Sequence, residues 1–225
     1  MREEAGKYHF HHGVNCLFEM ATSDARRILP ACCHPMEVQH TRSVLAVTCF
    51  TFHGGDAGLY EEVVLAILVP PMLRSGEPLP KAAMFPFLVG CSTEEGRKQG
   101  IERWKLPHFM ENIRGEFQES DDGKELLVKM SGSGSPILDM TVTAHDFEES
   151  ELLFHSFMCD DSGDYKSNLI LRGKGYSEHE NQTGSLQLYE HEMTKSLTLD
   201  DVDDVPFREQ WMKDGTEIFH ELEDV

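Results

Sequence analysis

The chain has 225 residues, of which 40% are apolar, enough to form one sizeable core. Acidic residues outnumber basic residues 40 to 20, and the formal charge of −20 disfavours contact with nucleic acid or anionic lipid. No apolar stretch approaches the roughly 20 residues that a membrane-spanning helix requires, and the polar N-terminus lacks the apolar core of a signal sequence. We therefore expect a single cytoplasmic domain over residues 1–225 that binds neither nucleic acid nor membrane.

The first third of the chain predicts strands separated by one short helix. Residues 14–20 form an apolar, strand-like run, after which Thr22 or Ser23 can cap a helix that a proline ends. Residues 43–52 are rich in β-branched and aromatic side chains and predict a buried strand. A glycine-rich turn follows, and residues 60–69 form the most apolar strand candidate of the sequence.

The middle of the chain predicts a loop, a short helix and two tight turns. Residues 70–80 contain four prolines and predict a loop. A helix is predicted from Thr93, which would cap it, to Gly100, which would end it. Asp-Asp-Gly-Lys at 121–124 predicts a hairpin turn, and residues 132–136 predict a second turn. Further strands are predicted over residues 83–89, 114–117, 125–130, 137–144, 152–158, 169–172 and 184–190.

The C-terminal segment, residues 200–225, is acidic and has helical spacing of its apolar residues. Phe207, Trp211, Ile218 and Phe219 would line one face of that helix, with the charged residues in solvent. With this helix, the sequence predicts many short strands, several hairpins and only two or three helices. The pattern is typical of a largely antiparallel β-barrel or β-sandwich with helices at its margin.

Generic functional motifs are absent from the sequence. It contains no GxGxxG, P-loop, GxSxG or HExxH pattern. Its six cysteines include no CxxC pair, which favours reduced, mostly buried thiols over a zinc site or a disulfide framework. Composition and generic motifs therefore lead no further than an acidic, β-rich domain.

Four segments carry a resemblance to a known family. They are residues 14–30 with Met36-Glu37-Val38, residues 60–63 (Tyr-Glu-Glu-Val), residues 100–107 (Gly-Ile-Glu-Arg-Trp-Lys-Leu-Pro), and residues 183–191 with Leu197 and Val205-Pro206. Their order and spacing, across nearly the whole chain, resemble acetoacetate decarboxylase and its relatives. The resemblance implies an α+β, mostly β structure: a cone-like antiparallel β-barrel with an internal active-site cavity and a few peripheral helices. It also implies a homo-oligomer.

In that family a lysine forms a Schiff base with the substrate ketone, and desolvation or a nearby cation keeps this lysine neutral. Here the corresponding position and the next one hold His108 and Phe109. Imidazole cannot form the imine, so Schiff-base decarboxylation is expected to be absent or feeble. A family arginine in the first strand aligns approximately with Glu19, whereas the family glutamate after the tyrosine is retained as Glu62.

The resemblance implies His108 and Glu62 as candidate catalytic residues, and Glu19, Phe109 and Lys105 as candidate substrate-binding residues. A histidine with an unperturbed pKa near 6.5 suits general acid–base catalysis. His108 with Glu62 and Glu19 can form a histidine–carboxylate pair or half of a metal site, or His108 can be a hydrogen-bonded histidine in a decayed pocket. Lys105 is the alternative Schiff-base lysine, although on a strand it would face away from His108.

Two functions remain open from the sequence, and both need a small-molecule partner and no metal or other cofactor. In the first, the protein acts on a small oxo-acid or related carbonyl compound in the barrel cavity, with acid–base chemistry by His108 and Glu62. In the second, the same cavity binds a small apolar ligand without catalysis. Clustering of His108, Glu62 and Glu19 would favour the enzyme, and a cavity of Phe and Met with one or two polar groups would favour the binding protein.

Overall fold

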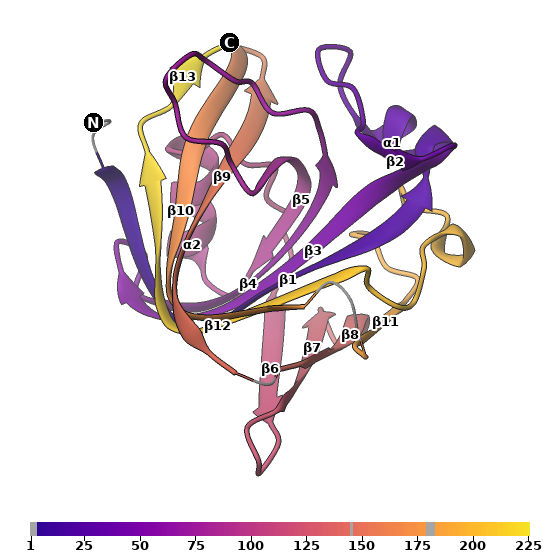
Figure 1. Ribbon diagram of the computed structural model, residues 1–225, viewed down its shortest axis with the longest axis vertical. Helices are drawn as coiled ribbons and strands as arrows, with labels where there is room; N and C mark the ends of the chain where they lie inside the picture. The colour runs from indigo at the N-terminus through magenta and orange to yellow at the C-terminus, as the bar shows by residue number, and fades with distance from the viewer. Residues whose placement is uncertain (1–3, 145, 179–182) are drawn as a thin grey trace.

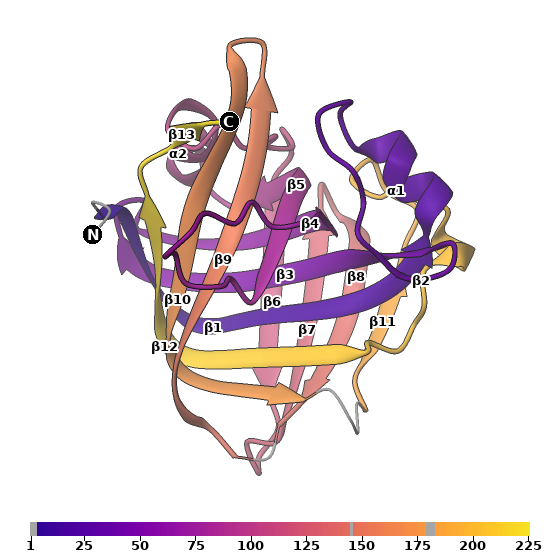
Figure 2. The same ribbon diagram turned by 45° about the horizontal axis from the view of Figure 1, so that its top comes forward.

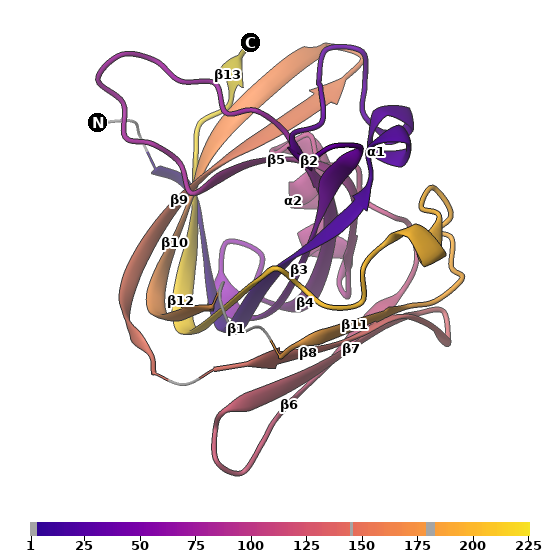
Figure 3. The ribbon, with the colours of Figure 1, turned by 45° about the vertical axis from the view of Figure 1, so that its right-hand side comes forward.

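The computed structural model describes residues 4–144, 146–178 and 183–225, and within them seven long strands close into a barrel, seen as a ring in Figure 3. In order around the barrel the strands are β1 (Glu4–Ala21), β12 (Arg208–His220), β10 (Gly163–Glu178), β9 (Glu148–Asp160), β5 (Ala82–Cys91), β4 (Leu59–Leu68) and β3 (Arg42–Gly55). The ring closes because β3 also pairs with β1. All neighbours are antiparallel except β5 and β9, which are parallel over three residue pairs.

A second sheet lies beneath the barrel in the view of Figure 1. It consists, in order, of β11 (Ser185–Leu188), β8 (Ser135–Thr143), β7 (Glu125–Gly132) and β6 (Ile113–Glu119). The short elements are α1 (Thr22–Ile28), β2 (Glu37–Gln39), α2 (Glu94–Glu102), the 3-10 turn η1 (Leu199–Asp201) and β13 (Glu223–Asp224). Figure 2 shows β1, β3 and β12 side by side across the barrel wall, with α1 at one end of them.

Strand β4 separates two hydrophobic cores because successive side chains of a strand point to opposite faces. Val63 and Leu65 pack between the barrel and the second sheet, whereas Tyr60 and Ala66 pack inside the barrel. Burying one such aliphatic side chain stabilises the fold by about 1.5–3 kcal/mol. The side chain of Glu62 shares its face with Tyr60, so the strand's alternation places this carboxyl group in the barrel interior.

The two short helices predicted before residue 105 form as α1 and α2, with differences at their ends. Thr93 caps α2 as predicted, since its hydroxyl accepts from the Gly96 N–H at 3.2 Å. The prediction that Gly100 ends this helix was wrong, because Gly100 is buried and its bare Cα leaves room for a neighbouring side chain while the helix continues. Helix α1 has Ala21 at its N-cap, because the Thr22 hydroxyl bonds instead to Ser43 Oγ at 2.9 Å.

The predicted C-terminal helix was wrong: residues 208–220 form strand β12 between β1 and β10. The apolar residues do not share one face, because Trp211 packs toward the second sheet and Phe219 packs inside the barrel. A strand buried on both faces has no simple alternation of apolar and polar residues. The apolar residues of this segment therefore had a spacing that also fits a helix. Gly215 also fits a strand here, since any side chain would collide with the Phe10 ring.

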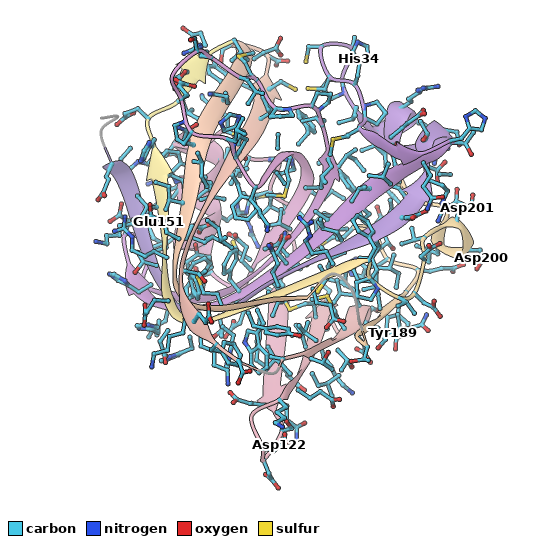
Figure 4. All side chains as sticks on the ribbon, in the orientation of Figure 1. His34, Asp122, Glu151, Tyr189, Asp200 and Asp201 are labelled. Carbon is cyan, nitrogen blue, oxygen red and sulfur yellow. The ribbon has the colours of Figure 1, made fainter. Side chains whose placement is uncertain are left out.

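Some of the acidic residues project from loops and hairpin tips. Figure 4 shows Asp122 at the tip of the β6–β7 hairpin, and Asp200 and Asp201 projecting from the segment before β12. All six cysteines are free thiols, of which Cys16, Cys49 and Cys91 are buried. In the part of the chain that the structure describes, no helix is long and apolar enough to cross a membrane.

Candidate functional site

Two carboxyl groups lie buried inside the barrel. Glu62 on β4 is 8% exposed and Glu217 on β12 is 4% exposed. Both line the same two adjoining cavities, of about 50 and about 10 Å³, and share them with Leu106 and Phe219. A single water needs roughly 10–15 Å³, so the larger cavity suits a molecule of a few heavy atoms. Glu217 was missed at the sequence level because its segment was interpreted as a surface helix.

The larger cavity is mostly apolar apart from the two carboxyl groups. Its wall includes Phe50, Phe154 and Leu171, and its other polar groups are few. Asn15 and Thr48 bond to each other, because Asn15 Nδ2 donates to Thr48 Oγ1 at 2.7 Å. Among the described residues that line either cavity there is no lysine, arginine or histidine. The two carboxyl groups therefore face an apolar space without a compensating cation.

Burial controls the protonation of this carboxyl pair. Burial raises the pKa of Glu62 to about 8. It also raises the pKa of Glu217 well above the usual value, and the neighbouring Glu62 charge raises it further. Two like charges in one desolvated site resist simultaneous ionisation. The pair therefore retains at least one proton at neutral pH, so that one carboxyl group can be an acid while the other is a base.

Tyr8 connects the carboxyl pair to helix α2. It is the cross-strand partner of Glu217, and its hydroxyl donates to Gln99 Oε1 at 3.2 Å. Trp104 Nε1 in turn donates to the Tyr8 hydroxyl at 2.7 Å. Burial raises the pKa of Tyr8 to about 12, with Glu217 adding to the effect, so this hydroxyl stays protonated. The tyrosine thus fixes the wall of the smaller cavity without contributing a charge.

His108 follows α2 and is held against the end of β5. Its backbone forms an isolated bridge with Val89, and the residue is 9% exposed. Nδ1 lies 3.6 Å from Cys91 Sγ. Nε2 is buried with no hydrogen-bond partner among the described residues, and it packs so closely on Gly100 that a Cβ there would lie 1.9 Å away.

The His108 ring is close to the carboxyl pair but does not share its cavities. Burial lowers the pKa of His108 to about 4, and the charge of Arg97 lowers it further, so the ring is neutral at pH 7. Among described residues, the walls of both cavities contain Glu62 but not His108. Cys91 is the cross-strand partner of Glu62, so one thiol lies between the histidine and that carboxyl group.

The structure does not bring Glu19 together with His108 and Glu62. Glu19 lies near the α1 end of β1, where Arg42 Nε donates to its carboxylate at 3.2 Å. Gly13 on the same strand pairs with Phe50, which is the cross-strand partner of Glu62. Glu19 is six residues further along, roughly 20 Å away at about 3.3 Å per residue.

Phe109 and Lys105 also point away from the carboxyl pair. Phe109 packs with the core between barrel and second sheet, edge-on to His191 with ring centroids 5.7 Å apart. Lys105 Nζ forms an ion pair with Asp160 Oδ2 at 3.2 Å, at the tip of the β9–β10 hairpin. Within residues 4–144, 146–178 and 183–225, no group of three or more His, Cys, Asp or Glu is placed to hold a metal ion.

The sequence matches no protein-family model and no curated protein, but solved structures share the architecture. An acetoacetate decarboxylase from Legionella pneumophila has 15% identity and a TM-score of 0.64, over 98% of this chain and 88% of that one. The enduracididine biosynthesis enzyme MppR, complexed with pyruvate, has 10% identity and a TM-score of 0.61, over 100% and 91%. An acetoacetate decarboxylase-like enzyme from Sphingomonas wittichii has 11% identity and a TM-score of 0.57, over 99% and 93%.

Proposed function

We propose that this chain, which has the acetoacetate decarboxylase-like fold, binds a small carbonyl compound in its barrel cavity and moves protons on it through Glu62. The buried pair of Glu62 and Glu217 carries the proposal. A protonated carboxyl group can donate to the ligand's carbonyl oxygen, while an ionised one takes a proton from the adjacent carbon. Two carboxyl groups that share a proton supply both roles in one site.

The cavity lining favours an uncharged carbonyl compound over an oxo-acid anion. A ligand carboxylate beside Glu62 and Glu217 would meet negative charge in a site of low polarity. No cation lines this cavity among the described residues. A small ketone or aldehyde, or an oxo-acid whose carboxylate points away from the pair, avoids that repulsion. The cavity volume of about 50 Å³ restricts the ligand further to a few heavy atoms.

In this proposal His108 acts on Glu62 through Cys91 and does not touch the ligand. The supporting contacts are the 3.6 Å approach of His108 Nδ1 to Cys91 Sγ and the pairing of Cys91 with Glu62. The neutral, desolvated ring keeps the surroundings of Glu62 apolar, which maintains its raised pKa. His108 is thus a positioning residue, and Glu62 is the residue that exchanges the proton.

The decisive test is exchange of the α-hydrogens of butanone with D₂O, followed by ¹H NMR. The wild-type protein is expected to accelerate the exchange, and Glu62→Gln is expected to reduce the acceleration by about 100-fold or more, as for loss of a general acid–base. The matched control is Glu61→Gln, at the neighbouring position of β4 that is half-exposed. Equal exchange by wild-type protein and Glu62→Gln would contradict the proposal.

The alternative function, binding of a small apolar ligand without catalysis, is favoured by the largely aromatic and aliphatic wall of the cavity. The same experiment separates the two functions. If butanone shifts cavity resonances but exchanges no faster than in buffer, the protein is a binding protein.

Treatment with acetoacetate and sodium borohydride is expected to leave every lysine unmodified. No lysine lines the cavities among the described residues, and Lys105 is paired with Asp160. Intact-protein mass spectrometry measures the outcome, with a lysine-dependent acetoacetate decarboxylase treated in parallel as the positive control. A reduced adduct on any lysine would mean that Schiff-base chemistry survives.

A further inference from the structure

A cavity of about 390 Å³ lies between the loop that joins α1 to β2 and the hairpin that joins β9 to β10. Its wall shares no described residue with the two cavities of Glu62 and Glu217. Cys32 of the loop contacts Asp164 of the hairpin here, with 3.4 Å between Cys32 Sγ and Asp164 Oδ1. Figure 2 shows the loop and the hairpin at the same end of the barrel. The proposed function uses no residue of this cavity.

Sulfur is concentrated in the wall of this cavity. Four of its eleven residues carry sulfur, whereas the whole chain has six cysteines and eleven methionines among 225 residues. These four residues are Cys32, Cys33, Met72 and Met158. They come from the α1–β2 loop, from the segment between β4 and β5, and from β9, so it is the fold that gathers them. Thiolate and thioether sulfur are soft donors that select soft metal ions.

The two thiols of the loop are placed to hold one ion together. The Cys33 N–H donates to the Pro30 carbonyl at 3.0 Å and closes a turn, within which the Sγ atoms of Cys32 and Cys33 lie 3.9 Å apart. A metal–thiolate bond is about 2.3 Å long, so one ion can bond to both sulfurs with an angle of about 115° between the two bonds. Cys32 is exposed and Cys33 is half-buried, so an ion can reach them from solvent.

The available donors favour monovalent copper over zinc. A structural zinc site needs four Cys, His, Asp or Glu ligands, and in the part of the chain that the structure describes no three of these are grouped to hold a metal. His34 is exposed at the tip of the loop, as Figure 4 shows. Two thiolates and a thioether suit Cu(I). Met72 is half-buried and flexible enough to supply the thioether, whereas Met158 Sδ already accepts from Ser156 Oγ at 3.1 Å.

We propose that Cys32, Cys33 and Met72 bind one Cu(I) ion in this cavity. The ion displaces one proton from each thiol and bonds to the two thiolates and the thioether, and no atom changes its oxidation state. The Cys32 thiol already donates to Asp164 Oδ1, so this carboxylate can pass the Cys32 proton to solvent. Phe157, a buried residue of the same wall, shields the ion from water on its inner side.

The test is an anaerobic titration of the reduced protein with Cu(I) in competition with the chromophoric chelator bicinchoninate. The wild-type protein is expected to take one equivalent of Cu(I) from the chelator. Cys32→Ser and Cys33→Ser are each expected to weaken Cu(I) binding about 100-fold or more, and Met72→Leu about tenfold. The matched controls are Cys49→Ala, which removes a thiol of the core, and Met110→Leu, which removes an exposed methionine elsewhere. Both controls are expected to keep the wild-type affinity.

Copper K-edge X-ray absorption identifies the donor atoms directly, and a first shell of sulfur alone is expected. Three results would overturn the proposal: no removal of Cu(I) from bicinchoninate, a first shell that contains nitrogen, or full affinity in both serine variants. Thermal unfolding without metal shows whether each variant is folded, and one folded serine variant is sufficient. Glu62→Gln is expected to bind Cu(I) like the wild type, because the two sites share no wall residue. Its loss of Cu(I) would place the ion at the carboxyl pair and contradict the assignment.

Discussion

At pH 8, Glu62→Gln is expected to have a larger free energy of unfolding than the wild-type protein, by up to about 5 kcal/mol at 1.4 kcal/mol per pKa unit. The pKa of Glu62 rises from the usual 4.5 to about 8 on folding because the carboxyl group is buried. The ionised form of Glu62 therefore destabilises the folded state, whereas glutamine has nearly the same shape and never ionises. The substitution that removes the proposed proton donor thus strengthens the fold.

The pH dependence gives this prediction its sign. Between pH 4.5 and about 8 the folded protein holds a proton on Glu62 that the unfolded chain has released. The contribution of this group to stability is therefore full below pH 4.5 and is lost as the pH rises to about 8. Urea unfolding at pH 5 and pH 8 measures it. The difference between Glu62→Gln and wild type should grow with pH, while Glu61→Gln follows the wild type; a constant difference would contradict the prediction.

Glu209→Ala is expected to destabilise the fold by about 4 kcal/mol, because a fully buried carboxylate with several donors is removed. Glu209 lies on β12 and is 0% exposed. Its carboxylate accepts the backbone N–H groups of Thr143, Thr183 and Gly184 at 2.8, 2.9 and 2.7 Å. It therefore ties the barrel wall to the end of β8 and to the residues that enter β11.

Urea unfolding of Glu209→Ala at pH 7 tests this role, with Glu148→Ala as the matched control. Glu148 is exposed at the start of β9, so its loss should change the stability by no more than about 0.5 kcal/mol. Hydrogen exchange of the Thr143 and Gly184 amides gives a local measure, because these donors lose their acceptor. Equal stability of the two variants would contradict the prediction, because the Glu209 carboxylate would then not be needed to hold the second sheet to the barrel.

Local chemistry made much of the fold predictable. The Asp-Asp-Gly-Lys turn at 121–124 joins β6 to β7 as predicted, and Thr93 caps α2. Strand β7 alternates between buried and exposed residues because only one of its faces meets the core. Strand β12 was not predicted, for the opposite reason. Four consecutive residues, 209–212, are buried, so burial on both faces removed the alternation on which a strand prediction depends.

The candidate site was only partly predictable. Glu62 followed from the resemblance to acetoacetate decarboxylase, and its inward orientation follows from the alternation of β4. Its partner Glu217 is far from Glu62 in the sequence. The two carboxyl groups line the same cavity only because the barrel closes. No local pattern carries that information. The expected homo-oligomer and the cytoplasmic location stay predictions.

The double pairing of β1 has a consequence for how the chain folds. The first strand is flanked by β3 and by β12, so its partners come from residues 42–55 and from residues 208–220. During synthesis, β1 and β3 can pair early, but the other edge of β1 stays open until nearly the whole chain has left the ribosome. Contacts of such high sequence separation slow folding and expose an unpaired edge to other chains. We expect the rate-limiting step of folding to be the docking of β12, and this step also completes the site by bringing Glu217 to Glu62.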